Sequence, residues 1–145
     1  MVQLQRRRDA LLVIGLGPAG TKSFVFELSG TDVKAEHRAP ETRALPPEHL
    51  LHDVQRAFFR GLAGGPRADG EHAEEAAGER LVEDWKDGRL LERRFTRLDG
   101  EPPGAVRLRY EGGWAPGETP PRVTLDNGWL GYTLAIETLS ARALE

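Results

Sequence analysis

The sequence predicts an α+β protein that is mostly antiparallel β-sheet, with about seven or eight short strands and one main helix packed on a face of the sheet. Short segments alternate between apolar and polar residues, glycine-rich turns separate them, and one longer segment has the period of a helix. The 145 residues are 39% hydrophobic and 30% charged, which is close to the average of globular proteins. We therefore expect one small domain over residues 1–145.

Residues 1–63 are predicted to form a β-meander followed by the helix. Strands are expected over Leu11–Leu16 and Ser23–Leu28, which are rich in residues that favour strands and are separated by a glycine turn. A short third strand is expected over Val33–Arg38, after a further turn at residues 29–32. In the second of these three strands, alternate residues from Phe24 onward face one side of the sheet.

The helix is expected over Glu48–Leu62, just after two prolines. Leu51, Val54, Phe58 and Leu62 recur at the spacing that places side chains on one helical face. Glycines at the end of this segment are expected to stop the helix.

Residues 64–79 are predicted to be a mobile linker or exposed loop. They are rich in glycine and charge and contain no large apolar side chain. A short helical turn over Ala73–Ala77 is compatible with this composition.

Residues 80–140 are predicted to form antiparallel hairpins. Asp87-Gly88 predicts a tight turn between strands over Arg80–Trp85 and Arg89–Leu98, because both residues tolerate positive φ. The alternation from Val106 to Glu111 predicts a strand with one solvated face.

A second tight turn is predicted at Asp126-Asn127-Gly128, joining Val123–Leu125 to a strand over Trp129–Leu139. The latter is the strongest strand signal in the chain. Its inward face is expected to consist of four side chains: Leu130, Tyr132, Leu134 and Ile136.

The composition excludes several classes of site. The chain has no cysteine, so it cannot form disulfides, thiolate zinc sites or a cysteine nucleophile. The net charge of −3 gives no reason to expect nucleic-acid binding. The apolar run Ala10–Leu16 is too short to span a bilayer. Gly15, Gly17 and Pro18 interrupt it and strong β character follows at once, which indicates a strand and not a leader peptide. The cytoplasm is the expected location.

No catalytic residue, metal site or cofactor is predicted. His49 and His52 lie one helical turn apart but no third ligand is marked, so a solvated helix face is the favoured interpretation. The carboxylates of the second half lie at turns, where aspartate is selected for backbone reasons. The serines lack the context of a nucleophile elbow.

Gly15-Leu16-Gly17-Pro18-Ala19-Gly20 matches the glycine pattern of dinucleotide-binding proteins. That site needs a helix directly after the glycines, so that its first amides face the pyrophosphate. The residues from Lys22 to Leu28 instead alternate like a strand. A glycine turn in a hairpin is therefore the favoured interpretation.

Leu12–Pro40 resembles the opening hairpins of the actin-like sugar kinases and other ribonuclease-H-like folds, with Gly20-Thr21-Lys22 at the phosphate-binding turn. Gly17 stands where those families carry a metal-associated aspartate. The resemblance implies a phosphate- or nucleotide-binding unit using Gly17, Gly20, Thr21 and Lys22. This is the alternative function, since backbone amides of such a turn can hold phosphate without a carboxylate.

The favoured function is a non-catalytic binding or assembly protein. Trp85, Trp114 and Trp129 lie at or near predicted hairpin ends or loops, where aromatic side chains commonly anchor a partner or close a small core. The many short strands also leave edges that need pairing or protection. The expected partner is another protein or a second copy of the chain.

Five arginines are expected to form a basic stripe on the outer face of the sheet, balanced by Glu92 and Glu111 across neighbouring strands. They are Arg93, Arg94, Arg97, Arg107 and Arg109.

Overall fold

A computed structural model describes residues 1–7, 9–44, 46–62 and 65–138. Its backbone contacts divide the chain into two compact units, Met1–Arg56 and Ala57–Glu145, and each unit is described by itself. The expectation that residues 1–145 form one domain stays a prediction.

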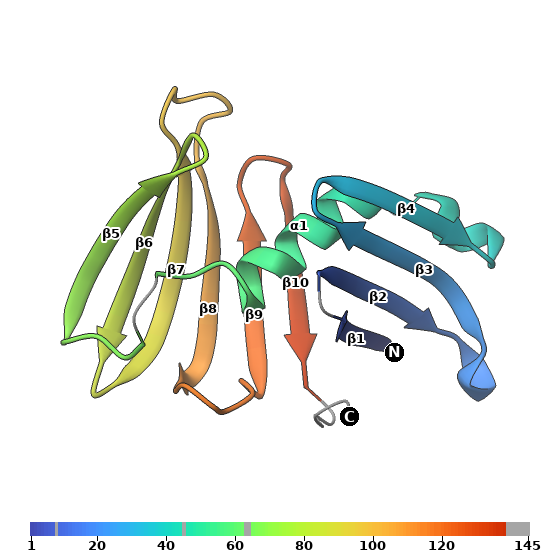
Figure 1. The fold of residues 1–145 in the computed structure, drawn as a ribbon, viewed down its shortest axis with the longest axis horizontal. Coiled ribbons are helices and arrows are strands. Elements are labelled where there is room, and N and C mark those ends of the chain that lie inside the picture. The colour runs from blue at the N-terminus through green and yellow to red at the C-terminus, as the bar shows by residue number, and fades with distance from the viewer. Residues whose placement is uncertain (8, 45, 63–64, 139–145) are drawn as a thin grey trace. The chain divides into compact units, whose positions relative to one another are not determined.

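The described residues contain ten strands in two antiparallel sheets and one α-helix (Figure 1). A mostly antiparallel α+β protein is therefore confirmed, but the predicted number of seven or eight strands is wrong. The strands of the first sheet are β1 (Val2–Arg7), β2 (Ala10–Leu16), β3 (Lys22–Ser29) and β4 (Asp32–His37), in that order across the sheet.

The first unit is built around β2 and β3, which supply its buried side chains. Val13 lies opposite Phe26, and Leu11 lies opposite Leu28; all four are buried. The predicted alternation from Phe24 to Leu28 is confirmed by the burial pattern of β3. β1 was not predicted: Val2 and Leu4 do alternate with glutamines, but two apolar residues are a weak signal and the end of the strand is basic.

Gly15 is required where β2 meets β3. A Cβ atom at this position would lie 2.1 Å from the ring of Phe24, closer than two non-bonded carbon atoms can approach. The Phe24 ring thus covers the bare backbone of Gly15, its neighbour across the strands.

The segment after Gly20 is extended, as predicted. A short 3₁₀ turn, η1 (Pro18–Gly20), joins β2 to β3, and a second, η2 (Pro40–Ala44), follows β4. The dinucleotide-type helix that the glycine pattern would need is absent from residues 22–28, which the structure describes in full.

The helix α1 (Pro47–Phe58) begins one residue before the predicted Glu48 and ends four residues before Leu62. Its predicted face is buried at Leu51 and Val54. The last two residues of α1 belong to the second unit, and packing of the whole helix on a sheet face stays a prediction.

The early end of α1 has a cause in tertiary contacts. In a continuing helix the Ala57 carbonyl would accept a hydrogen bond from residue 61. It accepts instead from the Tyr110 hydroxyl at 2.6 Å and from the Arg93 guanidinium at 3.2 Å. The chain then turns away, and the Leu62 amide donates to Glu83 at 3.3 Å.

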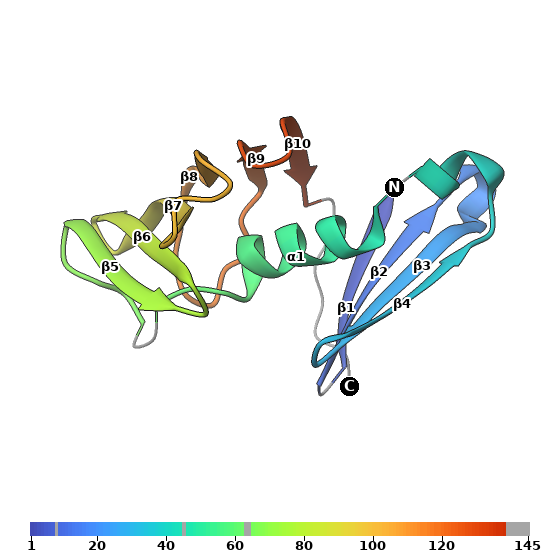
Figure 2. The same ribbon diagram turned by 90° about the horizontal axis from the view of Figure 1, so that it is seen from above.

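The second unit contains a six-stranded antiparallel sheet with the spatial order β10-β9-β8-β7-β6-β5. Its strands are β5 (Gly70–Ala76), β6 (Glu79–Lys86), β7 (Arg89–Arg97), β8 (Ala105–Trp114), β9 (Arg122–Asn127) and β10 (Tyr132–Glu137). In both views β5 and β10 lie at opposite edges of this sheet (Figure 1 and Figure 2).

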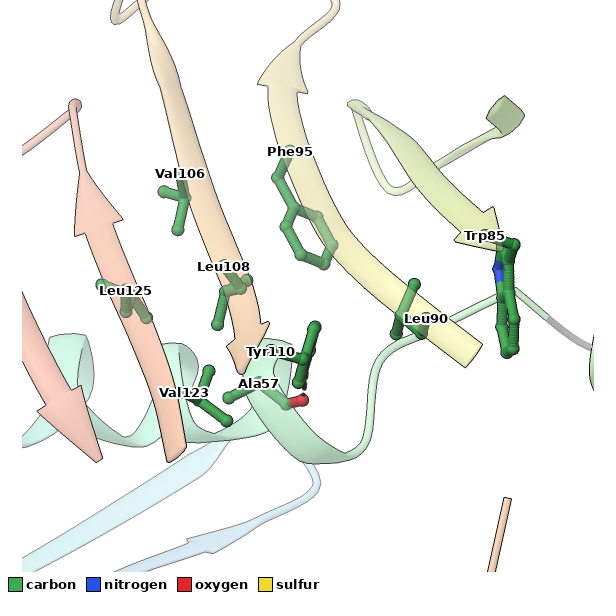
Figure 3. Packing of buried hydrophobic residues seen from close by; sticks show 9 residues of the cluster. All are labelled: Ala57, Trp85, Leu90, Phe95, Val106, Leu108, Tyr110, Val123 and Leu125. Atoms are coloured by element: carbon green, nitrogen blue, oxygen red, sulfur yellow. Dashed lines mark hydrogen bonds between the residues drawn. The ribbon is translucent and has the colours of Figure 1, made fainter. Parts of the chain in front are cut away.

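One face of the six-stranded sheet carries the core of the second unit. Phe95, Val106 and Leu108 are fully buried, and Ala57 from the end of α1 joins them. Figure 3 shows these side chains on one side of the sheet, with the Tyr110 hydroxyl directed at Ala57. The predicted solvated face of β8 is confirmed by its alternating burial.

β5 lies within residues 64–79, where a mobile linker or exposed loop was predicted, so that prediction is wrong for Gly70–Ala76. These residues also form a strand where a helical turn over Ala73–Ala77 was compatible with the composition. The strand pairs with β6 along its whole length. Ala77 and Gly78 form the tight turn between them, with φ of 53° and 75°. The composition gave a wrong prediction because both faces of this edge strand are largely exposed. Its sequence therefore lacks the apolar alternation that marks a strand.

The Asp87-Gly88 turn is confirmed, with positive φ at both residues. The turn predicted at residues 126–128 lies instead at residues 128–131. Asn127 remains in β9, and its side chain accepts hydrogen bonds from the amides of Trp129 and Leu130. The shared inward face of β10 is confirmed for Tyr132, Leu134 and Ile136, whereas Leu130 lies in the turn. Residue 139, the predicted end of this strand, lies outside the described residues.

Within the described parts of the chain, no helix combines the length and the apolar character needed to cross a membrane.

Candidate functional site

Two of the three predicted tryptophans line one pocket of about 140 Å³ in the second unit. Trp85 comes from the end of β6 and Trp114 from the end of β8, and Leu90 and Pro116 complete much of the apolar lining. We call this the tryptophan pocket. The hairpin turn at Asp87-Gly88 explains the juxtaposition, because it returns the chain so that Leu90 lies opposite both Trp85 and Trp114.

A buried ion pair lies beside the tryptophan pocket. Arg93 Nε donates to Glu83 Oε2 at 2.7 Å, and the two side chains are 7% and 1% exposed. Glu83 Oε1 also accepts hydrogen bonds from Trp85 Nε1 and from the Leu62 amide, both at 3.3 Å. These bonds offset the cost of removing both charges from water.

The same ion pair is joined to the end of α1. Arg93 and Tyr110 both donate to the Ala57 carbonyl, which lies at the negative end of the helix dipole. Burial raises the pKa of the Tyr110 hydroxyl well above its ordinary value of 10.0. The hydroxyl therefore keeps its proton and remains a donor.

The indole groups of the tryptophan pocket have partners for their N–H groups. Trp85 Nε1 donates to Glu83, and Trp114 Nε1 donates to the Glu118 carbonyl at 2.8 Å. The ring centroids of Trp114 and Tyr110 are 5.3 Å apart, and the Arg93 guanidinium carbon lies 5.7 Å from the centroid of the Trp114 ring. What these residues present to the pocket is therefore mainly ring surface.

Trp129 lies at the other end of the sheet. Its Nε1 donates to the Gly104 carbonyl at 3.2 Å, just before β8 begins, and the Arg97 guanidinium lies 4.7 Å from its ring. Trp114 ends the same strand β8. The structure thus brings Trp85 and Trp114 together and separates Trp129 from them, and a role in partner binding stays a prediction for all three.

A second pocket, of about 250 Å³, lies between the residues after α1 and the β5–β6 hairpin. Phe59 and Leu81 give it apolar walls, but Arg60 and Glu79 form an ion pair at 2.9 Å within its lining. Glu74 adds a further carboxylate. Its charged groups are mostly directed at one another.

The predicted basic stripe is correct in part. Arg94, Arg107 and Arg109 surround Glu92 on the outer face, with closest contacts of 3.2 to 3.9 Å. Arg93 and Arg97 are instead on the inner face, because they lie two residues before and two residues after Phe95 and share its side of the strand. Arg93 is buried there, and Arg97 contacts the buried Glu79 at 3.6 Å.

The Gly17–Lys22 turn uses the amides that a bound phosphate would need. The Gly17 amide donates to the Thr21 carbonyl at 2.8 Å, and the Gly20 amide donates to the Gly17 carbonyl at 3.2 Å. As it stands, the turn does not offer these two amides to a ligand, and nucleotide binding stays an untested alternative.

In residues 1–7, 9–44, 46–62 and 65–138, no three histidine or carboxylate side chains are grouped so that they could hold a metal ion.

The outer edge of β10 is the other candidate site. No described strand pairs with this side of β10. The Thr138 amide donates to the Pro121 carbonyl at 2.9 Å, which continues the β9–β10 register by one residue pair. In an antiparallel pair, residues bonded to the neighbour alternate with residues whose N–H and C=O groups point away. Thr133, Ala135 and Glu137 therefore direct their backbone groups to the open side.

The chemistry of the four edge strands differs. β1 ends in Arg6-Arg7, β4 carries charges along its length, and β5 contains Glu71, Glu74 and Glu75. Charged side chains on an edge strand discourage pairing with another chain. β10 has no charge before Glu137 and no proline.

The model of one protein family, described as "Protein of unknown function (DUF3261)", matches residues 1–140. The chain belongs to the DUF3261 family. No curated protein and no solved structure matches it significantly.

Sequence reasoning did not find the buried pair of Glu83 and Arg93 in this DUF3261 chain, because charged residues were assigned to solvated faces. A signal was present. Glu83 lies between Leu81 and Trp85 at inward positions of β6, and the strand register places it opposite Arg93. A charge at an inward position of one strand facing an opposite charge on the next indicates a buried pair.

Proposed function

We propose that this DUF3261 protein is a non-catalytic assembly protein whose β10 edge pairs with an extended strand, in the first instance the β10 of a second copy. The observation that carries the proposal is that β10 is an edge strand with open backbone groups and no charge over its first five residues. Natural proteins rarely leave such an edge unpaired.

The sequence of β10 is complementary to itself. In an antiparallel pair centred on Ala135, the residues with open backbone groups face one another, and Thr133 lies opposite Glu137 of the second copy. Leu134 then lies opposite Ile136 of the second copy, which extends the apolar inner face. No like charges meet, which favours a symmetric pair.

The same operation on β5 is unfavourable. The tight turn at Ala77-Gly78 makes Ala76 and Glu79 a bonded pair, so Glu71, Ala73 and Glu75 point their backbone groups outward. A symmetric pair centred on Ala73 would place Glu71 opposite Glu75 of the second copy. This repulsion supports β10 over β5 as the pairing edge.

Proline scanning of the two edges tests the proposal by light scattering after size exclusion. Ala135→Pro removes an outward amide without removing a bond to β9, so we expect the wild type to be a dimer and this variant a monomer. Ala73→Pro is the matched control at the other edge and should remain dimeric. Far-UV circular dichroism of each variant checks that the sheet is retained.

A wild type that stays monomeric over a wide concentration range would overturn the proposal. So would an Ala135→Pro variant that folds and remains dimeric.

A further inference from the structure

The tryptophan pocket is a candidate ligand site that is separate from the β10 edge. It lies against β6 and β7, on the far side of the sheet order from β10. The exposed residues Gly65 and Pro116 lie at its rim, whereas Trp85 and Leu90 are 7% and 2% exposed.

The polar groups around the pocket are engaged within the protein. Both oxygens of Glu83 accept hydrogen bonds, and Arg93 donates to Glu83 and to the Ala57 carbonyl. The ion pair is neutral as a whole. A charged ligand would lose its hydration here without gaining a matched partner, so the chemistry favours a neutral, apolar group.

The size and lining of the pocket favour a single ring. Its volume of about 140 Å³ leaves room for one ring, since an engineered, enclosed apolar cavity of about 150 Å³ binds benzene; unlike that cavity, the tryptophan pocket is open to solvent on one side. Two indole rings contribute to its wall, and aromatic rings prefer offset or edge-to-face contacts with other aromatic rings. The aliphatic Leu90 and Pro116 add to a lining that is mainly apolar, with Glu83 and Arg93 as its charged members.

We infer that the tryptophan pocket binds one neutral aromatic ring of about the size of benzene. Such a ring is available from a free small molecule or from a phenylalanine side chain of a protein partner. The chemistry of recognition is the same in both cases, because the pocket contacts only the ring.

Fluorine NMR on the full-length protein tests the inference with three probes. Fluorobenzene carries the free ring, N-acetyl-4-fluorophenylalanine amide carries the same ring on a peptide backbone, and 4-fluorobenzoate adds a charge. We expect a saturable shift of the fluorobenzene signal and none for 4-fluorobenzoate. Saturable binding of the phenylalanine derivative as well would identify a side chain as a possible source, and binding of fluorobenzene alone would identify a small molecule.

Variants that fill the tryptophan pocket with a larger side chain test the site, and the same side chain placed elsewhere is their control. Ala115 lies in the lining, so Ala115→Phe should abolish the saturable shift and the smaller Ala115→Leu should weaken it. Leu130→Phe adds a ring at the exposed β9–β10 turn, at the other end of the sheet, and should leave the shift unchanged. Circular dichroism establishes that each variant is folded.

The inference is overturned if the fluorobenzene signal changes only linearly with protein concentration. It is also overturned if folded Ala115→Phe saturates like the wild type, or if 4-fluorobenzoate binds as well as fluorobenzene.

Discussion

Because the Glu83 carboxylate is buried, the stability of the fold depends on the positive charge of Arg93 beside it. Arg93→Met leaves the Glu83 carboxylate buried without its cation, and we expect a loss of about 3–5 kcal/mol in the free energy of unfolding. Arg94→Met is the control, because Arg94 lies on the outer face and its ion-pair contacts are 3.9 Å long; its loss should be within about 1 kcal/mol. Urea denaturation measures both, and equal losses would contradict the burial argument.

Tyr110 should couple stability to pH in the alkaline range. Its folded-state pKa is raised, so the unfolded chain releases this proton more readily once the pH passes about 10. The contribution of Tyr110 to stability is thus complete below pH 10 and falls as the pH rises above it.

Tyr110→Phe tests this coupling. At pH 7 the variant should lose about 1 kcal/mol, because the Ala57 carbonyl keeps only the bond from Arg93. Between about pH 10 and 12, its stability should fall less steeply than that of the wild type. Urea denaturation at several pH values measures the slope, and Tyr132→Phe, which leaves Tyr110 in place, should retain the steep fall. Parallel slopes for the wild type and Tyr110→Phe would be the contrary result.

At the residue scale, the sequence correctly predicted which face a side chain occupies wherever the residues follow the apolar alternation of their strand. The inward set of β3 and that of β8 were predicted correctly for this reason. Arg93 was placed on the wrong face because its charge outweighed its position two residues before Phe95. The meeting of Trp85 with Trp114 depends on the register between β6, β7 and β8, which single-strand patterns do not contain.

At the scale of elements, a single substitution in the turn of the β5–β6 hairpin should raise the stability of the protein. Ala77 has a φ of 53°, a left-handed conformation that costs a residue with a Cβ atom about 1–2 kcal/mol. Asparagine tolerates it better and is favoured before glycine in this turn type. Ala77→Asn should therefore raise the melting temperature, with a gain of roughly 0.5–1 kcal/mol.

Ala73→Asn places the same side chain in the middle of β5, where asparagine is disfavoured. It should lower the melting temperature or leave it unchanged. A gain for both variants would show that the effect does not come from the turn.

The elements were predictable from sequence to the extent that local rules decide them. The Asp87-Gly88 turn was found because two positive φ values select those residues. The turn after β9 was misplaced because Asn127 acts through its side chain, accepting bonds from two turn amides while its backbone stays in the strand. The end of α1 is set by Arg93 and Tyr110, distant partners that no local rule reveals.

At the scale of the whole molecule, each compact unit has its own buried side chains. The main core cluster of the second unit draws only on residues from Ala57 onward. Gly15→Ala should destabilise the first unit by about 1–3 kcal/mol through the clash with the Phe24 ring.

Native-state hydrogen exchange reads out where that destabilisation acts. We expect amides of β2 and β3 to lose protection and those of β7 and β8 to keep it. In a Phe24→Leu background, Gly15→Ala should cost less. Equal loss of protection in both units would show that they unfold as one.

The two edges of the six-stranded sheet differ in charge, and this difference limits how many molecules can add to one continuous sheet. If two molecules join through β10, the combined sheet presents a β5 edge at each end, and both are rich in glutamate. Such a sheet repels further molecules at both termini. The acidic border would thus make the dimer a closed product and prevent an open-ended fibre.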